Sequence, residues 1–217
     1  MSENARPKRR YDGAGRRQQA GATRAKVVAA AARVFLRHGY AGATIPAIAA
    51  EAGVALQTVY RAAPGKAGLL AAAVTAAVAG GFERSLTPVE ERPAVRAMIQ
   101  EKDPQRQLAL YAHTQPGIWS RVGPLLRVLE IAAASEPDLR RLQEEEDAKR
   151  LAGLTRYARL LKDRGALREG LTPEHAAEII VTLGSHATYD NLVVKSGWTD
   201  SQYEGWLTDT LQHSLLG

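Results

Sequence analysis

Hydrophobic residues recur at three- and four-residue steps at the start of the region from residue 23 to residue 80. This spacing predicts an amphipathic helix that turns one face toward a core. The apolar positions on this face are Ala25, Val28, Ala29, Ala32, Phe35 and Leu36. Gly39 follows, where the C-terminus of a helix favours a left-handed residue. Arg37 and His38 precede it, and positive charge there suits the helix dipole. We therefore expect the first helix to end near Gly39.

Two short helices are predicted to follow the first one. Thr44 can cap the second helix, and Pro46 is compatible with that helix's first turn. Gly53 then makes a turn into a third helix, which runs from Ala55 to about Ala62. Two short helices joined by a glycine-containing turn are typical of a helix-turn-helix, whose second helix enters the major groove of DNA.

The third helix has a solvent-facing side that carries the candidate contacts with DNA. Glutamine can form two hydrogen bonds with adenine, and arginine can do the same with guanine. Gln57 and Arg61 are therefore the candidates for contacts with base edges, while Val59 turns inward. Counted from the start of the helix, the solvent-facing side holds Leu56, Gln57, Thr58, Tyr60 and Arg61.

The rest of the chain is also predicted to be helical. Glycines and prolines break the pattern between residues 80 and 93, although the fourth helix is expected to run to about Arg84. Further helices are predicted over 93–101, 104–115, 118–134, 137–164, 173–196 and 199–216, with a break at Pro116 and Gly117. Thr172 is predicted to cap the helix over 173–196, and Thr199 with Gln202 to form a capping box for the last helix. No alternating strand pattern is present, so the fold class is all-α. We expect a flexible basic arm over 1–22, a DNA-binding domain over 23–80, and a helical effector-binding and dimerisation domain over 81–217.

The predicted helix from residue 173 to residue 196 is apolar nearly all round, which indicates burial on two sides. One interpretation is a central helix of a monomeric core. The other is a two-fold interface with a second copy, which a DNA-binding head needs in order to span two half-sites. The interface residues expected on the second interpretation, with support from the last helix, are Ala177, Ile180, Gly184, Ala187, Thr188 and Leu211.

Positive charge is concentrated at the start of the chain. Residues 1–26 carry eight Lys and Arg against two acidic residues, and their net charge of +6 equals that of the whole chain. The basic residues are Arg6, Lys8, Arg9, Arg10, Arg16, Arg17, Arg24 and Lys26. A solvated tail is one explanation. Because the arm directly precedes a helix-turn-helix, contact with phosphate or with the minor groove is the better one, and it makes Arg16, Arg17 and Arg24 candidate DNA contacts.

The sequence offers no support for catalysis, a metal site or a cofactor. Cysteine is absent, which excludes disulfides, thiolate metal sites and a cysteine nucleophile. His175 and Glu178 form a lone pair of the kind found in surface contacts. No glycine-rich phosphate loop follows a strand. The basic start lacks the apolar run of a signal peptide, and no stretch is long enough to span a membrane, which together favour a cytoplasmic protein.

Aromatic and polar residues alternate in the helices after residue 80, and this pattern fits a ligand pocket between helices. It fits an ordinary core with hydrogen-bonded tyrosines equally well. The candidate pocket residues are Phe82, Tyr111, His113, Gln115, Trp119, Tyr157, His186 and Tyr189.

Two runs in the N-terminal region resemble the DNA-binding domain of TetR-type transcriptional regulators. They are TIPAIAAEAGVALQTVYR and, further on, PGKAGLL, and the resemblance extends from Thr23 to about Gly80. It implies that Thr44, Tyr60 and Lys66 contact phosphate. It also implies a homodimer and a small effector bound in the C-terminal domain. The chain departs from the family at three places: Ala55 replaces a polar cap, Ala62 and Ala63 replace an aromatic pair, and Ala47 replaces a frequent acidic residue.

The sequence thus leads to two hypotheses from different classes. The first is a homodimeric transcriptional regulator, a repressor that a small-molecule effector releases from a palindromic double-stranded DNA operator. The second is a helical small-molecule-binding or enzymatic protein whose helix-turn-helix no longer binds DNA. Thr44, Thr58, Tyr60, Lys66 and the basic arm favour the first, because a degenerate module would be expected to lose some of them. A regulator that activates transcription, or one without an effector, stays open.

Overall fold

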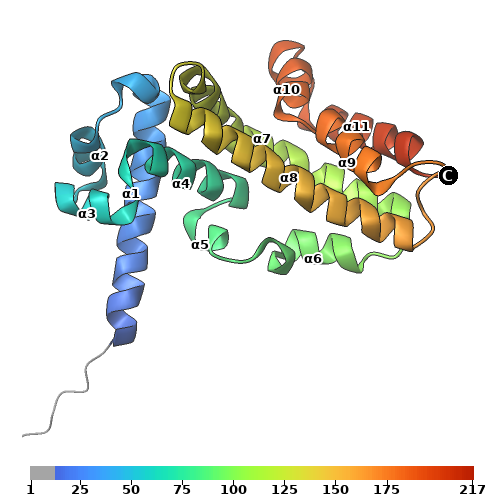
Figure 1. Ribbon diagram of the computed structural model, residues 1–217, viewed down its shortest axis with the longest axis horizontal. Coiled ribbons are helices and arrows are strands. Elements are labelled where there is room, and N and C mark those ends of the chain that lie inside the picture. The colour runs from blue at the N-terminus through green and yellow to red at the C-terminus, as the bar shows by residue number, and fades with distance from the viewer. Residues whose placement is uncertain (1–12) are drawn as a thin grey trace, which may run out of the picture.

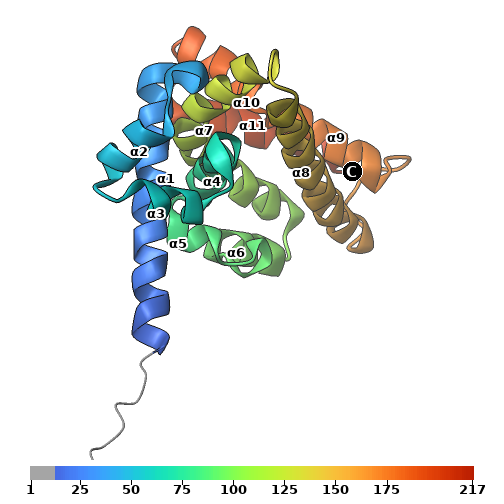
Figure 2. The same ribbon diagram turned by 60° about the vertical axis from the view of Figure 1, so that its left-hand side comes forward.

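The computed structural model describes residues 13–217, apart from the side chains of residues 13, 14, 16 and 17. Its first helix, α1, spans Gly13–Gly42, and the backbone leaves helical geometry at Gly39, where φ is 65° and ψ is 179°. The predicted break at Gly39 is therefore confirmed. The boundary of the arm at residue 22 is corrected, because residues 13–22 already belong to α1, and their N-terminal part projects away from the other helices (Figures 1 and 2).

Three further helices complete the N-terminal part: α2 (Ile45–Ala52), α3 (Leu56–Ala62) and α4 (Gly65–Ala79). In Figures 1 and 2, α2 and α3 lie on one side of α1, and the C-terminal helices lie on the other. Two residues expected on the buried face of α1 are exposed, Ala29 and Leu36, the latter to 48%, because α1 turns Val27, Ala31 and Val34 toward the core instead. Phe35 and Val59 are buried as expected, and so is Ile48; all three are 0% exposed. Burial of these residues fixes the angle at which α3 leaves α2.

The connection to the C-terminal part is more broken than the sequence predicts. The fourth helix ends at Ala79 rather than near Arg84, because Gly80 and Gly81 adopt φ values of 79° and 142°, which L side chains rarely reach. The short helices α5 (Phe82–Ser85), η1 (Val89–Glu91) and α6 (Pro93–Gln100) follow. They lead the chain under the bundle to the start of α7.

Helix α7 spans Pro104–Ala133 without a break, which corrects the predicted interruption at Pro116 and Gly117. A proline inside a helix removes one hydrogen bond and pushes against the preceding turn. Here Pro116 is itself buried, between the buried residues Ala112 and Trp119 of the same apolar face. Packing against neighbouring helices therefore outweighs the local preference for a break.

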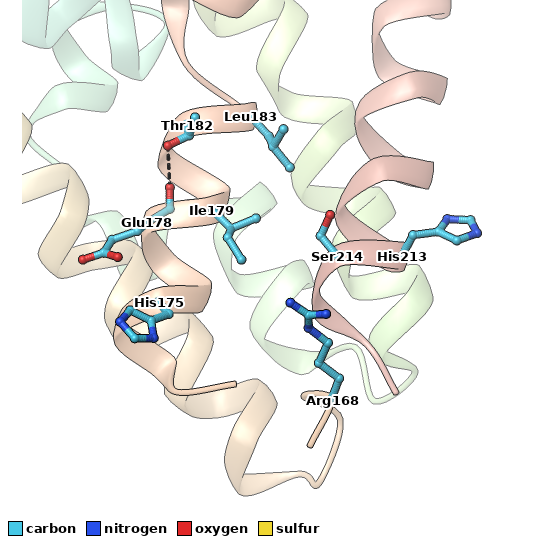
Figure 3. A pocket seen from close by; sticks show the side chains of 8 residues that line it. All are labelled: Arg168, His175, Glu178, Ile179, Thr182, Leu183, His213 and Ser214. Atoms are coloured by element: carbon cyan, nitrogen blue, oxygen red, sulfur yellow. Dashed lines mark hydrogen bonds between the residues drawn. The ribbon is translucent and has the colours of Figure 1, made fainter. Parts of the chain in front are cut away.

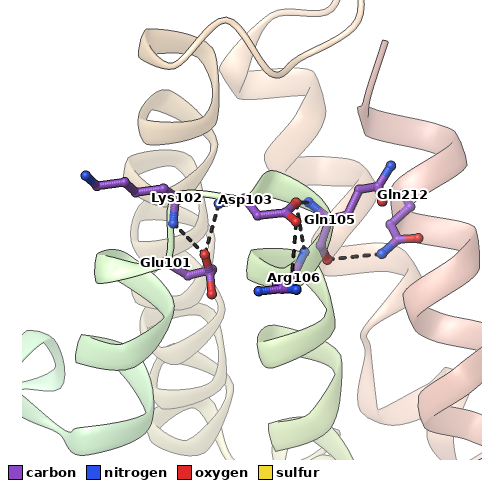
Figure 4. Close-up of polar contacts among 6 residues, drawn as sticks. All are labelled: Glu101, Lys102, Asp103, Gln105, Arg106 and Gln212. Carbon is purple, nitrogen blue, oxygen red and sulfur yellow. Dashed lines mark hydrogen bonds and ion pairs between the residues drawn. The ribbon is translucent and has the colours of Figure 1, made fainter.

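The start of α7 is held by a set of polar contacts (Figure 4). The side chain of Asp103 accepts hydrogen bonds from the backbone N–H groups of Gln105 and Arg106, at 2.9 and 3.4 Å. The amide of Gln212, near the C-terminus of the chain, donates to the carbonyl of Gln105 at 3.0 Å. These contacts cap α7 and attach the last helix to it.

The remaining helices are α8 (Pro137–Asp163), α9 (Pro173–Leu183), α10 (His186–Tyr189), the π-helix η2 (Asp190–Lys195) and α11 (Asp200–Leu215). The predicted cap at Thr172 and the capping box of Thr199 with Gln202 are both confirmed. Helix α7 packs against α1, α4, α6, α8 and α11, so it is the central element of the molecule.

The single helix predicted over 173–196 is wrong, because the chain forms three elements there. Helix α9 stops at Leu183, and the Ser185 hydroxyl accepts a hydrogen bond from the Thr188 N–H at 3.1 Å, which caps a new helix. The Thr188 hydroxyl in turn donates to the Thr182 carbonyl at 3.0 Å. These side chains satisfy backbone groups that the break leaves open, so the interruption is locally stable.

The all-α fold class is confirmed for the described residues, whose only β-type pairing is an isolated bridge between Leu167 and Leu216. One continuous cluster of buried apolar side chains joins the N-terminal and C-terminal parts through α1, α4 and α7. Between residues 13 and 217, no single helix is long and apolar enough to cross a membrane. Helices α3 and α4 meet that test only as a pair, across a bend of 62°.

Candidate nucleic-acid interface

The segment from the end of α1 to the start of α3, which contains α2, is built as the sequence predicts. The Thr44 hydroxyl caps α2 by accepting a hydrogen bond from the Ala47 N–H at 3.2 Å, and Pro46 lies in the first turn. Gly53 ends α2 with φ of 64°, which its lack of a side chain permits. Ala55 stands at the N-cap of α3 but provides no side-chain cap. This short, sharply turned connection leaves α3 on the outer side of α1.

The outer face of α3 is exposed to solvent and carries polar and aromatic side chains. Tyr60 is 57% exposed and Leu56 42%, and Gln57 and Arg61 are exposed as well. Thr58 is half-buried, and Val59 is fully buried, as predicted. Two groups suited to base edges, Gln57 and Arg61, therefore share one accessible face with Tyr60.

Lys66, a predicted phosphate contact, is already engaged in the structure. Its ammonium group donates a hydrogen bond to the backbone carbonyl of Tyr40 at 2.8 Å and lies 4.2 Å from the centre of the Tyr40 ring. The ring of Tyr40 stacks on Phe35 in turn. Lys66 therefore ties the N-terminus of α4 to the end of α1. The sequence analysis did not single out Tyr40, although an aromatic residue directly after Gly39 was a usable signal.

A charged cluster that the sequence analysis missed holds α2 against α1. Glu51 of α2 accepts a hydrogen bond from Arg33 of α1 at 2.6 Å, and it also pairs with Arg37 of α1. Hydrogen bonds from these two guanidinium groups lower the pKa of the Glu51 carboxyl below its usual value. The spacing of Arg33 and Arg37 on one face of α1 indicates a shared partner, but only the fold shows that this partner is Glu51.

The basic candidates before α2 are only partly described. Arg6, Lys8, Arg9 and Arg10 lie outside the described residues, and so do the side chains of Arg16 and Arg17. Arg24 is exposed, and its guanidinium lies 5.7 Å from the centre of the Phe82 ring on α5. Arg24 thus packs at the junction with the C-terminal part, away from α3.

A protein-family model described as bacterial regulatory proteins, tetR family, matches residues 27–73, which run from the middle of α1 into α4. The matched segment therefore has the sequence of the tetR-family DNA-binding region. The match contains the whole helix-turn-helix and Lys66, so it covers the exposed face of α3 described above.

Several solved structures share the fold over nearly the whole chain. A putative regulator from Mesorhizobium loti has a TM-score of 0.69 and 19% identity, covering 92% of this chain and 99% of its own. NalD of Pseudomonas aeruginosa, the secondary repressor of the MexAB-OprM multidrug efflux pump, has a TM-score of 0.63 and 21% identity, with coverage of 90% and 97%.

SmeT, the repressor of the multidrug efflux pump SmeDEF of Stenotrophomonas maltophilia, is also similar. Its complex with triclosan has a TM-score of 0.67 and 22% identity, with coverage of 90% and 92%. At these identities the likeness shows a common fold. No curated protein sequence matches the chain.

Five of the eight predicted ligand residues are gathered in the C-terminal helices. Tyr111 of α7 stacks on Tyr157 of α8, with ring centres 6.1 Å apart, and Trp119 of α7 lies 5.8 Å from His186 of α10. Tyr189 packs edge-on against Tyr203 of α11 at 5.2 Å. Burial and its hydrogen bond to Asp200 raise the pKa of Tyr189 to about 12.

The other three predicted ligand residues lie elsewhere. Phe82 is on α5 beside Arg24. His113 is exposed and pairs with Glu204 at 3.0 Å. Gln115 is buried, but its amide donates to Tyr111 and Thr114 of its own helix. The alternation of aromatic and polar residues therefore points to helices whose aromatic side chains meet, but it does not separate the side chains that face the interior from those that do not.

Two residues of the aromatic group were missed. Arg150 belongs to a charged run that suggests a solvated face, yet its guanidinium donates to the Gly184 carbonyl at 2.6 Å and lies 4.8 Å from the centre of the Trp119 ring. Tyr203 is fully buried in α11. A tyrosine in an amphipathic helix was a weak signal for Tyr203, and nothing in the sequence separated Arg150 from the neighbouring Lys149.

Four of the six predicted interface residues are buried inside the chain's own core. Ala177, Ile180 and Leu211 are 0% exposed, and Gly184 is buried against Tyr111. A β-carbon at Gly184 would lie 2.7 Å from the Tyr111 hydroxyl oxygen, so this glycine permits close packing within one chain. Those four predictions are wrong in their assignment to a surface, since a second copy cannot reach them. Ala187 is exposed and Thr188 half-buried.

Metal binding has no support in the part of the chain that the structure describes, because no group of three or more His, Cys, Asp or Glu side chains could hold an ion there.

Proposed function

We propose that the protein is a DNA-binding repressor of transcription that works in the cytoplasm as a homodimer and leaves its operator when a small-molecule effector binds. The observation that carries the proposal is the exposed face of α3, where Gln57, Tyr60 and Arg61 stand together on a helix-turn-helix. Such a face has the donors and acceptors that read base edges in the major groove.

Contacts with the DNA backbone are expected around this face. Thr44 is exposed at the N-terminus of α2, and Lys66 lies at the N-terminus of α4, where backbone N–H groups favour phosphate. The Lys66 ammonium has donors beyond the one given to Tyr40. The basic residues Arg6, Lys8, Arg9 and Arg10, together with Arg16 and Arg17, add positive charge to the sequence that precedes and begins α1.

Effector control is supported by the way in which α7 contacts the DNA-binding part. The Arg121 guanidinium of α7 donates to the Ala77 carbonyl in the last turn of α4 at 3.2 Å. A ligand that displaced α7 would therefore also displace α4, and with it the position of α3. NalD and SmeT are repressors with this fold, and SmeT forms a complex with triclosan, which makes repression and effector binding the natural proposal for this chain as well.

For the homodimer we propose the outer face of α9 and α11. A surface hollow lies there between the two helices (Figure 3), and the half-buried apolar side chains of Ile179 and Leu183 stand in it. The full lining is Arg168, His175, Glu178, Ile179, Thr182, Leu183, His213 and Ser214. Apolar side chains within a polar rim are typical of a protein–protein interface. This face replaces the buried residues that the sequence suggested.

The decisive experiment is a binding-site selection from random double-stranded DNA with the full-length protein. A homodimeric reader of the major groove should enrich two half-sites as an inverted repeat, with centres about one helical turn apart or a multiple of that distance. If the selection enriches no sequence, the proposal is wrong and the ligand-binding class of protein is favoured. A single enriched half-site would keep DNA reading and remove the homodimer.

A further inference from the structure

Five buried side-chain polar atoms of the described residues have no partner in hydrogen-bonding geometry; one is the Gln107 amide nitrogen, and the other four lie together in the C-terminal helices. These four are the hydroxyls of Tyr111, Tyr157 and Tyr203 and the indole N–H of Trp119. The four side chains are at most 7% exposed. Buried polar atoms in native proteins nearly always have a partner, because leaving one without a partner destabilises the fold. Arg150 interacts with the Tyr111 hydroxyl oxygen, and the Trp119 indole with that of Tyr203, but neither contact gives a tyrosine proton an acceptor. Three buried hydroxyl protons without an acceptor in one neighbourhood indicate a site that is completed by something outside the chain.

Arg150 adds a positive charge to the same neighbourhood. Its guanidinium lies over the Trp119 ring and bonds the Gly184 carbonyl, which is neutral. Among the described residues no carboxylate lies within ion-pair distance of it. Asp147, one turn earlier on α8, makes no ion pair with Arg150. Burial raises the pKa of the Asp147 carboxyl, and the Arg150 charge offsets only part of that rise. Arg150 is therefore a half-buried cation with no carboxylate in direct contact.

The polar groups converge on the C-terminal end of α9. The Arg150 guanidinium contacts the Gly184 carbonyl, and a β-carbon at Gly184 would lie 2.7 Å from the Tyr111 hydroxyl. Tyr203 is near enough to Tyr111 and Arg150 for their charges to influence its pKa. Three helices and the break after α9 thus bring one set of side chains together, namely Tyr111, Trp119, Arg150, Tyr157 and Tyr203. We name this set the donor cluster.

Every member of the donor cluster offers a proton. Burial raises the pKa of Tyr111, Tyr157 and Tyr203, so all three hydroxyls keep their protons at neutral pH. Indole and guanidinium groups are donors only. What the cluster lacks is an acceptor with negative charge. Water can accept these bonds but cannot neutralise Arg150.

We propose that the donor cluster binds the carboxylate of an aromatic acid, which is the effector class of this protein. The inference rests on the proposed function in taking the C-terminal helices as the effector site. The carboxylate takes the place of the Gly184 carbonyl at Arg150, a charge-assisted and often bidentate contact. The ring of the ligand packs among the aromatic side chains. Trp119 lies two residues before Arg121, whose guanidinium donates a hydrogen bond to a carbonyl of α4, so the site adjoins the contact with the DNA-binding part.

The test uses three probes that share one ring system: 2-naphthoate, 2-naphthamide and 2-naphthamidine. Binding to the full-length protein is measured by isothermal titration calorimetry without DNA. We expect 2-naphthoate to bind at least tenfold more tightly than the neutral amide, and the cationic amidine to bind most weakly. Arg150→Gln should remove the preference for the carboxylate, whereas the matched control Arg141→Gln, an exposed arginine on the same helix, should retain it.

The probe series keeps the proposal testable even if Arg150→Gln fails to fold. Equal affinity for 2-naphthoate and the amide would overturn the proposal, as would preference for the amidine or no binding of 2-naphthoate at millimolar concentration. The DNA selection is a separate measurement. If the protein binds 2-naphthoate selectively but does not bind DNA, the ligand site is supported and the repressor function is wrong. If it binds DNA but not 2-naphthoate, the repressor function is supported and the ligand site is wrong.

Discussion

At the scale of single residues, the outer face of α3 combines groups with different tasks. Gln57 and Arg61 are exposed and free to turn toward base edges, whereas Lys66 is fixed on Tyr40 at the edge of the helix-turn-helix. A base contact specifies sequence, and a phosphate contact fixes position on the DNA. Substitutions at these residues should therefore differ in their effect on sequence preference as well as in size.

We predict that Arg61→Ala weakens binding to the selected operator by about 1–3 kcal/mol and relaxes the preference at one base position. Lys66→Ala should weaken binding to all sequences alike, because it removes a phosphate contact. Fluorescence anisotropy with the operator and its single-base variants measures both effects. A uniform loss in Arg61→Ala, with the base preference unchanged, would show that Arg61 does not contact a base.

The lowered pKa of Glu51 makes a prediction about acid stability. A carboxyl group whose pKa is lower in the folded state stabilises the fold above its unfolded pKa, and this contribution is lost as the pH falls through the folded pKa. Glu51→Gln should therefore lower the melting temperature at pH 7, and the difference from the wild type should shrink below about pH 4. Glu145→Gln, an exposed control without an ion pair among the described residues, should show no such trend.

At the scale of elements, close packing between α7 and the segment after α9 depends on glycines in both. A β-carbon at Gly123 of α7 would lie 2.5 Å from His186 Nε2, and Gly184 accommodates Tyr111 in the same way. Burial lowers the pKa of His186, so the ring is neutral against Trp119 at pH 7. These contacts hold α10 on α7 although the helix before it has ended.

We predict that Gly123→Ala destabilises the protein by about 1–3 kcal/mol, because the added methyl group displaces the His186 ring. Urea denaturation measures the change. The double variant Gly123→Ala with His186→Ala should recover most of the loss relative to His186→Ala alone. Gly205→Ala in α11, where a β-carbon meets nothing within 4 Å, should be neutral or stabilising. Equal losses at both glycines would contradict the steric argument.

At the scale of the whole molecule, the proposed repressor needs two heads held at a fixed distance and charge placed against DNA. The bundle of α7, α8, α9 and α11 connects to α4 on one side and exposes the face of α9 and α11 on another. The sequence that precedes and begins α1 carries the whole net charge of the chain. Assembly and the electrostatic part of binding can therefore be changed separately.

We predict that Thr182→Arg dissociates the dimer, because it places a charge and added volume in the hollow on the exposed side of α9. Thr155→Arg on α8 is a matched variant, since both hydroxyls donate to the carbonyl four residues earlier in their helices. Analytical ultracentrifugation should show a monomer for the first and a dimer for the second. The reverse result would place the interface on α8.

We predict that deletion of residues 1–12 flattens the salt dependence of operator binding without changing the fold. The deletion removes Arg6, Lys8, Arg9 and Arg10 and leaves all of α1. The slope of log affinity against log salt should fall by about 0.9 for each DNA phosphate that the shortened protein no longer neutralises. An unchanged slope would mean that these residues do not touch DNA.

The sequence by itself determined the all-α class, the helix-turn-helix, the inward turn of Val59 and the caps at Thr44, Thr172 and Thr199. These features follow from local periodicity and from hydrogen bonds between near neighbours, which a single sequence displays. The tertiary structure alone decided that α7 passes through Pro116 and that the chain breaks after Leu183. It also decided that Arg150 turns inward to the Gly184 carbonyl and that Ile180 is buried in the core of its own chain. Each of these outcomes depends on which distant helix lies opposite, because packing and burial outweigh local preference there and leave no trace in the spacing of residues.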